Sequence, residues 1–134
     1  MAISIDKHIG LYQHALELRS QRANVLANNI ANADTPGYKA MDIDFQQMLK
    51  VRMGEASDVI TVATSDNQHF MSISQADTIT GLKFRNPTNP SIDGNTVDAQ
   101  TEKTEFVRNT MEYQAAFEFL NGKIKSLISA IKGE

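Results

Sequence analysis

The sequence predicts a mainly α-helical chain, in which two long terminal helices pair as an antiparallel coiled-coil hairpin around an irregular middle segment with a short helix and short β-strands. Apolar residues recur in alternating steps of four and three near both ends, and turn-forming residues crowd the part between. The 134 residues suit one modest domain. We therefore expect one assembly unit, made of an N-terminal helix and turn (1–38), a middle segment (39–96) and a C-terminal helix (97–134).

The N-terminal helix is expected over residues 3–32, where no proline interrupts the pattern. Its apolar row is broken only by Arg19, and alternate steps of four and three are the period of a coiled-coil seam. The seam consists of Ile5, Ile9, Tyr12, Leu16, Arg19, Ala23, Leu26 and Ile30. A two-helix hairpin alone has a thin core, so helices from other subunits are expected to cover the remaining apolar surface.

The C-terminal helix is expected over residues 97–132, with Asn95 as its N-cap after an Asp-Gly turn. Gly122 weakens the helix interior by about 1 kcal/mol relative to Ala, which indicates close packing or a bend there. The second seam consists of Phe106, Thr110, Tyr113, Phe117, Leu120, Ile124, Leu127 and Ile131.

The middle segment begins after a Pro-Gly turn and reads as short elements between turns. Asp44 and Gln47 have the spacing of a capping box, which predicts a short helix that ends near Gly54. Further along, "DVITVAT" (58–64), "MSIS" (71–74) and "GLKFR" (81–85) read as short strands.

Composition excludes several function classes. The chain has no cysteine, so disulfides, thiolate metal sites and thiol catalysis are absent. Its net charge is −3 without a Lys/Arg cluster, and no apolar run is long enough to span a membrane. We expect no nucleic-acid partner and no membrane span. Asp6, Lys7 and His8 interrupt the first apolar stretch, so a cleaved secretory signal is not expected either.

No catalytic or metal-binding pattern stands out. His14 and Glu17 share a helix face, but two possible ligands without a third predict a solvated polar face. Asp42 and Asp44 form a D-x-D pair, yet Asp44 has a capping role and no glycine-rich ligand loop follows. Nucleotide-binding and hydrolase motifs are missing. We expect no enzyme activity, no catalytic residue, no metal and no cofactor.

Asparagine is abundant in "NVLANNIANADTPGYK", residues 24–39, although it is a mediocre helix former. Residues four apart line up on a helix, so Gln21, Asn24, Asn28 and Asn32 form a ladder of amides beside a strip of alanines. A solvated face usually carries Lys and Glu. The ladder therefore favours a polar contact with a helix of another subunit, and a solvated amide-rich face is the alternative.

The exit from this helix is fixed by Pro36-Gly37, which fits the two central positions of a type II turn. The turn presents Tyr38 directly after it. The expected subunit interface comprises Gln21, Asn24, Asn28, Asn29, Asn32, Ala23, Ala27, Ala31, Thr35, Pro36, Gly37 and Tyr38.

These residues also resemble the signature of a known protein family. "ALELRSQRANVLANNIANADTPGYKAMDIDF" (15–45) resembles the N-terminal signature of the bacterial flagellar axial proteins, in which "ANNIANxxTPGY" follows an amphipathic helix. The short chain and "DGNTVDAQTEKTEF" (93–106) are most similar to subunits of the proximal rod. A middle rod subunit of the C type is the alternative within the family. A soluble coiled-coil adaptor or export chaperone is the alternative outside it.

The resemblance implies a structural subunit, exported unfolded by the flagellar type III apparatus without a cleaved signal. It implies helical assembly into a rod that crosses the periplasm in the basal body and transmits motor torque toward the hook. The implied partners are other flagellar rod subunits and, at the base, the FliE-type junction protein and the MS ring. We expect Asn28 and Asn32 to bond to a terminal helix of a neighbouring subunit.

Overall fold

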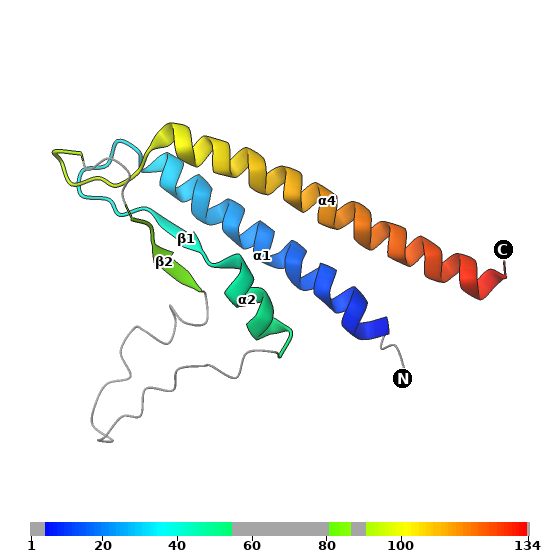
Figure 1. Cartoon of the computed structure of the whole chain (residues 1–134). Helices are drawn as coiled ribbons and strands as arrows, with labels where there is room; N and C mark the ends of the chain where they lie inside the picture. Colours follow the sequence, from blue (N-terminus) through cyan, green and yellow to red (C-terminus); the bar gives the residue numbers. More distant parts are fainter. Residues whose placement is uncertain (1–4, 55–80, 87–90, 134) are drawn as a thin grey trace, which may run out of the picture.

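The computed structural model describes residues 5–54, 81–86 and 91–133, with side chains from Ile9 onward in the first helix. Its elements are α1 (Ile5–Ala31), β1 (Met41–Ile43), α2 (Phe45–Arg52), β2 (Leu82–Phe84) and α4 (Ala99–Lys132). Figure 1 shows α1 and α4 side by side, with the strands and α2 on the other side of α1. The mainly helical fold with long helices at both ends is confirmed. Two predicted strands, 58–64 and 71–74, lie outside the described residues.

The first helix ends at Ala31, one residue before its predicted end, and the predicted Pro-Gly turn follows it. α1 has 27 residues, and at 1.5 Å per residue it is about 40 Å long. Beyond it, the Tyr38 amide donates to the Thr35 carbonyl at 3.3 Å. Gly37 has a φ of 73°, the left-handed value that a type II turn requires at its third position. The predicted turn is therefore confirmed.

The short elements after the turn form a small layer on α1. Met41 of β1 lies opposite Phe84 of β2, and the two strands are antiparallel. Asp44 caps α2 as predicted, because its carboxylate accepts a hydrogen bond from the Gln47 amide at 3.1 Å.

The hydrophobic core lies between this layer and α1. Leu18, Ile43 and Met48 are buried together there. The partly buried side chains around them are Val25, Phe45, Leu49 and Leu82. A core this small predicts that polar contacts also hold the layer in place.

The N-cap predicted for α4 was wrong. Asp98, and not Asn95, is the N-cap, because its carboxylate accepts hydrogen bonds from the Gln100 and Thr101 amides. The Asn95 carboxamide instead turns back toward the end of α1. Of the two alternatives predicted for Gly122, close packing is contradicted, since a Cβ placed there would meet no described atom within 4 Å. A bend at this position stays a prediction.

The contact between α1 and α4 has a polar centre. Asn29 of α1 donates to Glu102 at 3.1 Å, and Asn109 of α4 donates to the Arg19 carbonyl at 2.9 Å. Further along, the rings of Tyr12 and Phe119 lie with their centroids 6.4 Å apart. The side chains of Glu102 and Asn109 are each only 1% exposed, so polar residues occupy the middle of this contact.

Some residues of the two predicted seams are therefore buried or half-buried, and others are exposed to solvent. On α1, Leu26 is buried and Ile9, Tyr12, Leu16 and Ile30 are half-buried. On α4, Phe106, Leu120 and Leu127 are half-buried, whereas Tyr113, Phe117, Ile124 and Ile131 are exposed. At 3.6 residues per turn, the row of Phe106, Tyr113 and Phe117 lies on average about 50° round the helix from Glu102 and Asn109. The polar contacts therefore occupy the centre of the contact between α1 and α4, and this apolar row lies at the edge of that contact.

We expect Gly81→Ala to destabilise the fold by about 1–2 kcal/mol. Gly81 has a φ of 62°, and a Cβ there would overlap the buried Met48 side chain. Urea unfolding followed by circular dichroism measures the effect. Gly122→Ala is the matched control, expected to stabilise α4 by up to about 1 kcal/mol. Equal unfolding midpoints for the two variants would contradict this assignment.

Candidate functional site

Part of the predicted interface forms one exposed face of α1. The side chains of Asn24, Asn28, Ala27 and Ala31 are all exposed on this helix, and we call these four residues the amide face. Neither carboxamide makes a side-chain hydrogen bond within the described residues. The face thus offers donors and acceptors beside small residues that let another backbone approach closely.

Gln21 and Ala23 lie at the borders of the amide face. The Gln21 carboxamide is exposed but accepts a hydrogen bond from Arg52 of α2 at 3.0 Å. Ala23 is half-buried, on the side of α1 that faces α4. Both residues therefore already have contacts inside the chain.

Asn29 is a correction to the predicted interface. Its side chain is 0% exposed. The Asn29 amide nitrogen donates to the Met41 carbonyl and to Glu102, at 2.7 and 3.1 Å. Its oxygen accepts from the Met41 amide and the Tyr38 hydroxyl, at 3.2 and 3.3 Å. All of its hydrogen-bonding capacity is used inside the chain, so it has nothing to offer a neighbour.

Asn32 also bonds locally. Its amide nitrogen donates to the Asn28 carbonyl at 2.8 Å, and its side-chain oxygen accepts from Thr35 at 3.2 Å. Asn32 therefore serves the end of α1, and the expectation that its amide is free for a neighbouring helix is not supported.

Asn95 stabilises the turn after α1 through hydrogen bonds from its side chain. The amide nitrogen of Asn95 donates to three carbonyls, those of Asn32, Ala33 and Thr35, at 2.7–3.1 Å. The residues Thr35, Pro36 and Gly37 stay exposed. Tyr38, by contrast, turns its hydroxyl inward to Asn29. The turn is thus a fixed, exposed corner whose tyrosine belongs to the fold.

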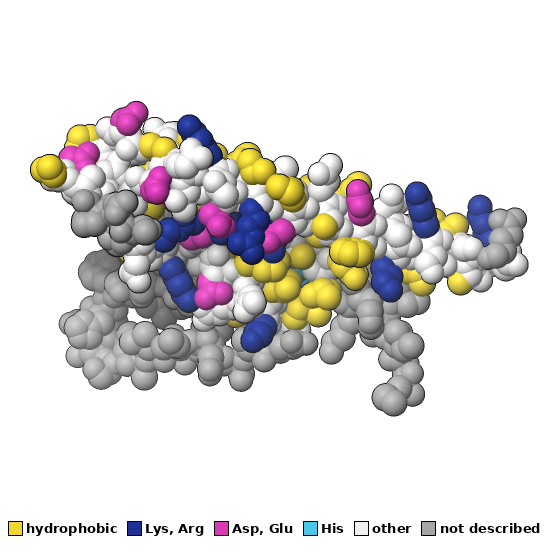
Figure 2. All heavy atoms as spheres, turned by 45° about the horizontal axis from the view of Figure 1, so that its top comes forward, with side chains coloured by type: hydrophobic (Ala, Val, Ile, Leu, Met, Phe, Trp, Pro, Cys, Tyr) yellow, Lys and Arg dark blue, Asp and Glu magenta, His cyan; other side chains and the backbone are white. Residues whose placement is uncertain are grey.

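A charged network joins the strands to both long helices. Arg22 of α1 binds Asp42 of β1 through a two-pronged contact, at 2.8 and 2.9 Å, and reaches Glu105 of α4 at 2.9 Å. Arg85, just after β2, binds Asp42 at 2.6 Å and Glu102 at 2.7 Å. Figure 2 shows basic and acidic side chains next to one another in the middle of the molecule, with hydrophobic side chains gathered beside them.

The network favours the charged forms of Asp42 and Arg22. Burial raises the pKa of Asp42, but hydrogen bonds from Arg22 and Arg85 outweigh this effect and hold that pKa below its ordinary value. The hydrogen bond to Asp42 in turn raises the pKa of Arg22. Sequence reasoning missed this network, because it treated Asp42 only as part of a rejected metal pair.

Arg19 breaks the apolar seam for a reason that the structure supplies. Its guanidinium lies 3.7 Å from the centroid of the Phe45 ring and forms an ion pair with Glu112 of α4. Burial is the main cause that lowers the pKa of Arg19 below its ordinary value. The residue therefore ties α2 to α4 across α1.

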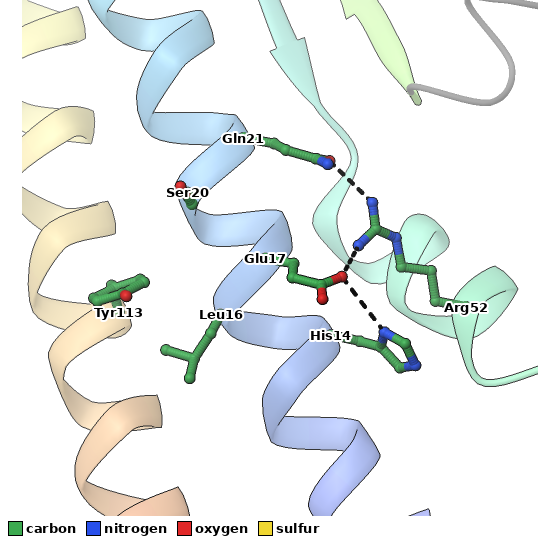
Figure 3. A pocket seen from close by; sticks show the side chains of 7 residues that line it. All are labelled: His14, Leu16, Glu17, Ser20, Gln21, Arg52 and Tyr113. Carbon is green, nitrogen blue, oxygen red and sulfur yellow. Dashed lines mark hydrogen bonds and ion pairs between the residues drawn. The ribbon is translucent and has the colours of Figure 1, made fainter.

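An open hollow of about 740 Å³ lies on α1 beside α2. Figure 3 shows His14, Glu17 and Gln21 from α1 converging with Arg52 from α2, while Leu16 and Tyr113 lie on the α4 side. Arg52 binds Glu17 at 2.8 Å, and the His14 Nδ1 atom is 3.8 Å from Glu17. Within the described ranges, no three acidic or histidine side chains gather as a metal site would require.

We expect Asn29→Ala to lower the free energy of unfolding by about 2–3 kcal/mol, because it leaves buried partners without hydrogen bonds. Asn28→Ala is the matched control on the neighbouring, exposed position, with an expected change within about 0.5 kcal/mol. Urea titration of both purified variants measures the difference. Similar losses in the two variants would contradict the assignment of Asn29 to the interior.

Stability should also depend on Asp42 through pH. A carboxylate whose folded-state pKa is depressed stabilises the fold above its unfolded pKa of about 3.9, and this contribution is lost as pH falls through the folded-state value. Between about pH 5 and pH 3, the urea midpoint of the unmodified chain should fall more than that of Asp42→Asn. Asp34→Asn, at an exposed aspartate, should keep the unmodified slope. Parallel pH profiles for all three proteins would rule out this role.

Comparisons with known proteins agree with the geometry. A family model described as "Flagella basal body rod protein" matches residues 13–39, which cover most of α1, the amide face and the Pro-Gly turn. No described helix is both long and apolar enough to cross a membrane.

Curated relatives match over almost the whole chain. The flagellar basal body rod protein FlgB of Aeromonas hydrophila is 50% identical, over 100% of this chain and 99% of its own length. FlgB of Escherichia coli K12 is 41% identical, over 98% of both chains. FlgB of Salmonella typhimurium is 39% identical, over 96% of both. The chain therefore belongs to the FlgB family of flagellar basal body rod proteins, which are structural subunits and not enzymes.

Proposed function

We propose that this rod subunit assembles helically with other axial proteins and transmits motor torque from the MS ring toward the hook. One observation carries the proposal: the residues matched by the family model, 13–39, include an amide face and a rigid corner that are both exposed. An exposed row of amides and alanines has no use in a solvated monomer, where Lys and Glu serve better. It does suit close contact with a neighbouring helix.

We further propose that α1 and α4 act as an antiparallel coiled-coil hairpin, with residues 1–38, 39–96 and 97–134 forming one assembly unit. The pairing is supported by contacts that run in opposite order along the two helices, from Asn29 with Glu102 to Tyr12 with Phe119. The uncovered apolar positions on α4 would then face other subunits.

The interior network suits a torque-bearing element. Arg22 and Arg85 connect β1 to both long helices through charge-assisted hydrogen bonds of 2.6–2.9 Å. To twist one helix relative to the other, several such contacts must shift together. Stiffness would therefore come from inside each subunit as well as from the contacts between subunits.

The partners follow from the same proposal. They are the other flagellar rod subunits, together with the FliE-type junction protein and the MS ring at the base. The flagellar type III apparatus would export the chain without a cleaved signal, and its place in the basal body would be periplasmic. The names of the relatives support a place in the basal body rod, and the resemblance to the flagellar axial proteins supports the partners and the export route.

The amide face provides a test. We expect Asn24→Ala combined with Asn28→Ala to reduce the amount of this subunit in purified basal bodies and to reduce swarming. The melting curve of the purified chain should not change, because neither side chain has a described partner. Gln46→Ala combined with Asn86→Ala removes two exposed carboxamides elsewhere on the chain and is the control. Normal rods and motility in the first variant would refute an assembly role for this face.

A further inference from the structure

We propose that a hollow between α1 and α4 receives a carboxamide side chain from the amide face of a second copy of this chain. This inference rests on the proposed rod assembly, and it specifies which surfaces of two neighbouring copies contact each other. The hollow has a volume of about 220 Å³. Its lining residues are Arg19, Ser20, Ala23, Asn109, Thr110 and Tyr113.

The hollow contains a buried acceptor that the chain leaves unused. Asn109 is 1% exposed, and its amide nitrogen donates to the Arg19 carbonyl at 2.9 Å. Its Oδ1 atom accepts no hydrogen bond from any described residue. A buried acceptor without a partner costs about 1–3 kcal/mol. The matching occupant therefore carries an N–H or O–H donor.

The lining also selects among donors. Arg19 is already paired with Glu112, and none of the described lining residues is a carboxylate that could pair with an entering Lys or Arg. A carboxylate would have no hydrogen to donate to Asn109. A neutral carboxamide meets both conditions, because it donates without bringing a charge.

The second copy carries such donors on a surface that can approach closely. Asn24 and Asn28 are exposed and have no side-chain partner within the described part of the chain. Ala27 and Ala31 flank them, so no bulky side chain keeps the two helices apart. On the receiving side, Ser20 and Ala23 are equally small, and the exposed ring of Tyr113 forms an apolar part of the wall.

The two surfaces lie on different sides of the same helix. Ala23 lines the hollow, whereas Asn24, the next residue, points about 100° further round α1. One copy therefore offers its amide face while the other offers its hollow, and each copy keeps one surface for the next neighbour. A contact between unlike surfaces of identical chains continues into a helical array instead of closing into a dimer.

Disulfide trapping tests the contact directly, since the chain has no cysteine of its own. Cells would produce two full-length versions with different tags, one with Asn24→Cys or Asn28→Cys and the other with Thr110→Cys. After oxidation of purified basal bodies, we expect a linked species that carries both tags. It should exceed by about tenfold the yield with Ala115→Cys, an exposed position about 140° round α4 from Thr110.

Three results would overturn the proposal: equal trapping with Ala115→Cys, no trapping although both versions are in the rods, or trapping of Thr110→Cys only to a different protein. Absence of the unmodified chain from basal bodies would instead refute the proposed rod function.

A second measurement applies if the cysteine versions do not enter rods. Ala23→Met would fill the hollow, and Ala115→Met is its size-matched control. Only Ala23→Met should lower incorporation into rods, by about tenfold, with an unchanged melting curve of the purified chain. Undiminished incorporation of Ala23→Met would mean that the hollow holds only solvent, and would overturn the proposal.

Discussion

The buried carboxylate of Glu102 is the constraint on which the rest of the structure depends. A charge that is 1% exposed is tolerated only with partners, and here Arg85 and Asn29 supply them. Arg85 reaches this position because β2 pairs with β1, and Asn29 because α1 runs beside α4. Loss of the oppositely charged partner of a buried charge, here Arg85, typically costs about 3–5 kcal/mol. The small core around Leu18 could hardly fix the strands as firmly by itself.

The need of the buried Glu102 carboxylate for partners also explains why α1 uses asparagine. Asn28 and Asn29 are consecutive, so their side chains point about 100° apart on the helix. Asn29 turns inward and completes the environment of Glu102, whereas Asn28 stays exposed. The poor helix propensity of these residues is offset on one side by internal hydrogen bonds and, in our proposal, on the other side by contacts with neighbours.

Sequence periodicity was sufficient to predict both long helices, and local chemistry was sufficient for the Pro-Gly turn and the Asp44 cap. Neither the periodicity nor the local chemistry could predict which face of each long helix contacts the other helix. That choice depends on pairs far apart in the chain, such as Arg22 with Glu105, 83 positions away. The amide ladder correctly located an exposed face at Asn24 and Asn28. The wider predicted interface also included Asn29 and Tyr38, but Asn29 bonds to β1 and α4, and the Tyr38 hydroxyl donates to Asn29.

The exposed apolar side chains of α4 affect how the strength of assembly depends on temperature. Phe117 is 53% exposed and Ile131 is 86% exposed in the single chain. If assembly covers such side chains, it removes apolar surface from water, and the change in heat capacity is negative. Hydrophobic association of this kind weakens on cooling. Contacts along α4 would then loosen in the cold, while the charged network inside each subunit, which does not rest on apolar burial, would keep its shape.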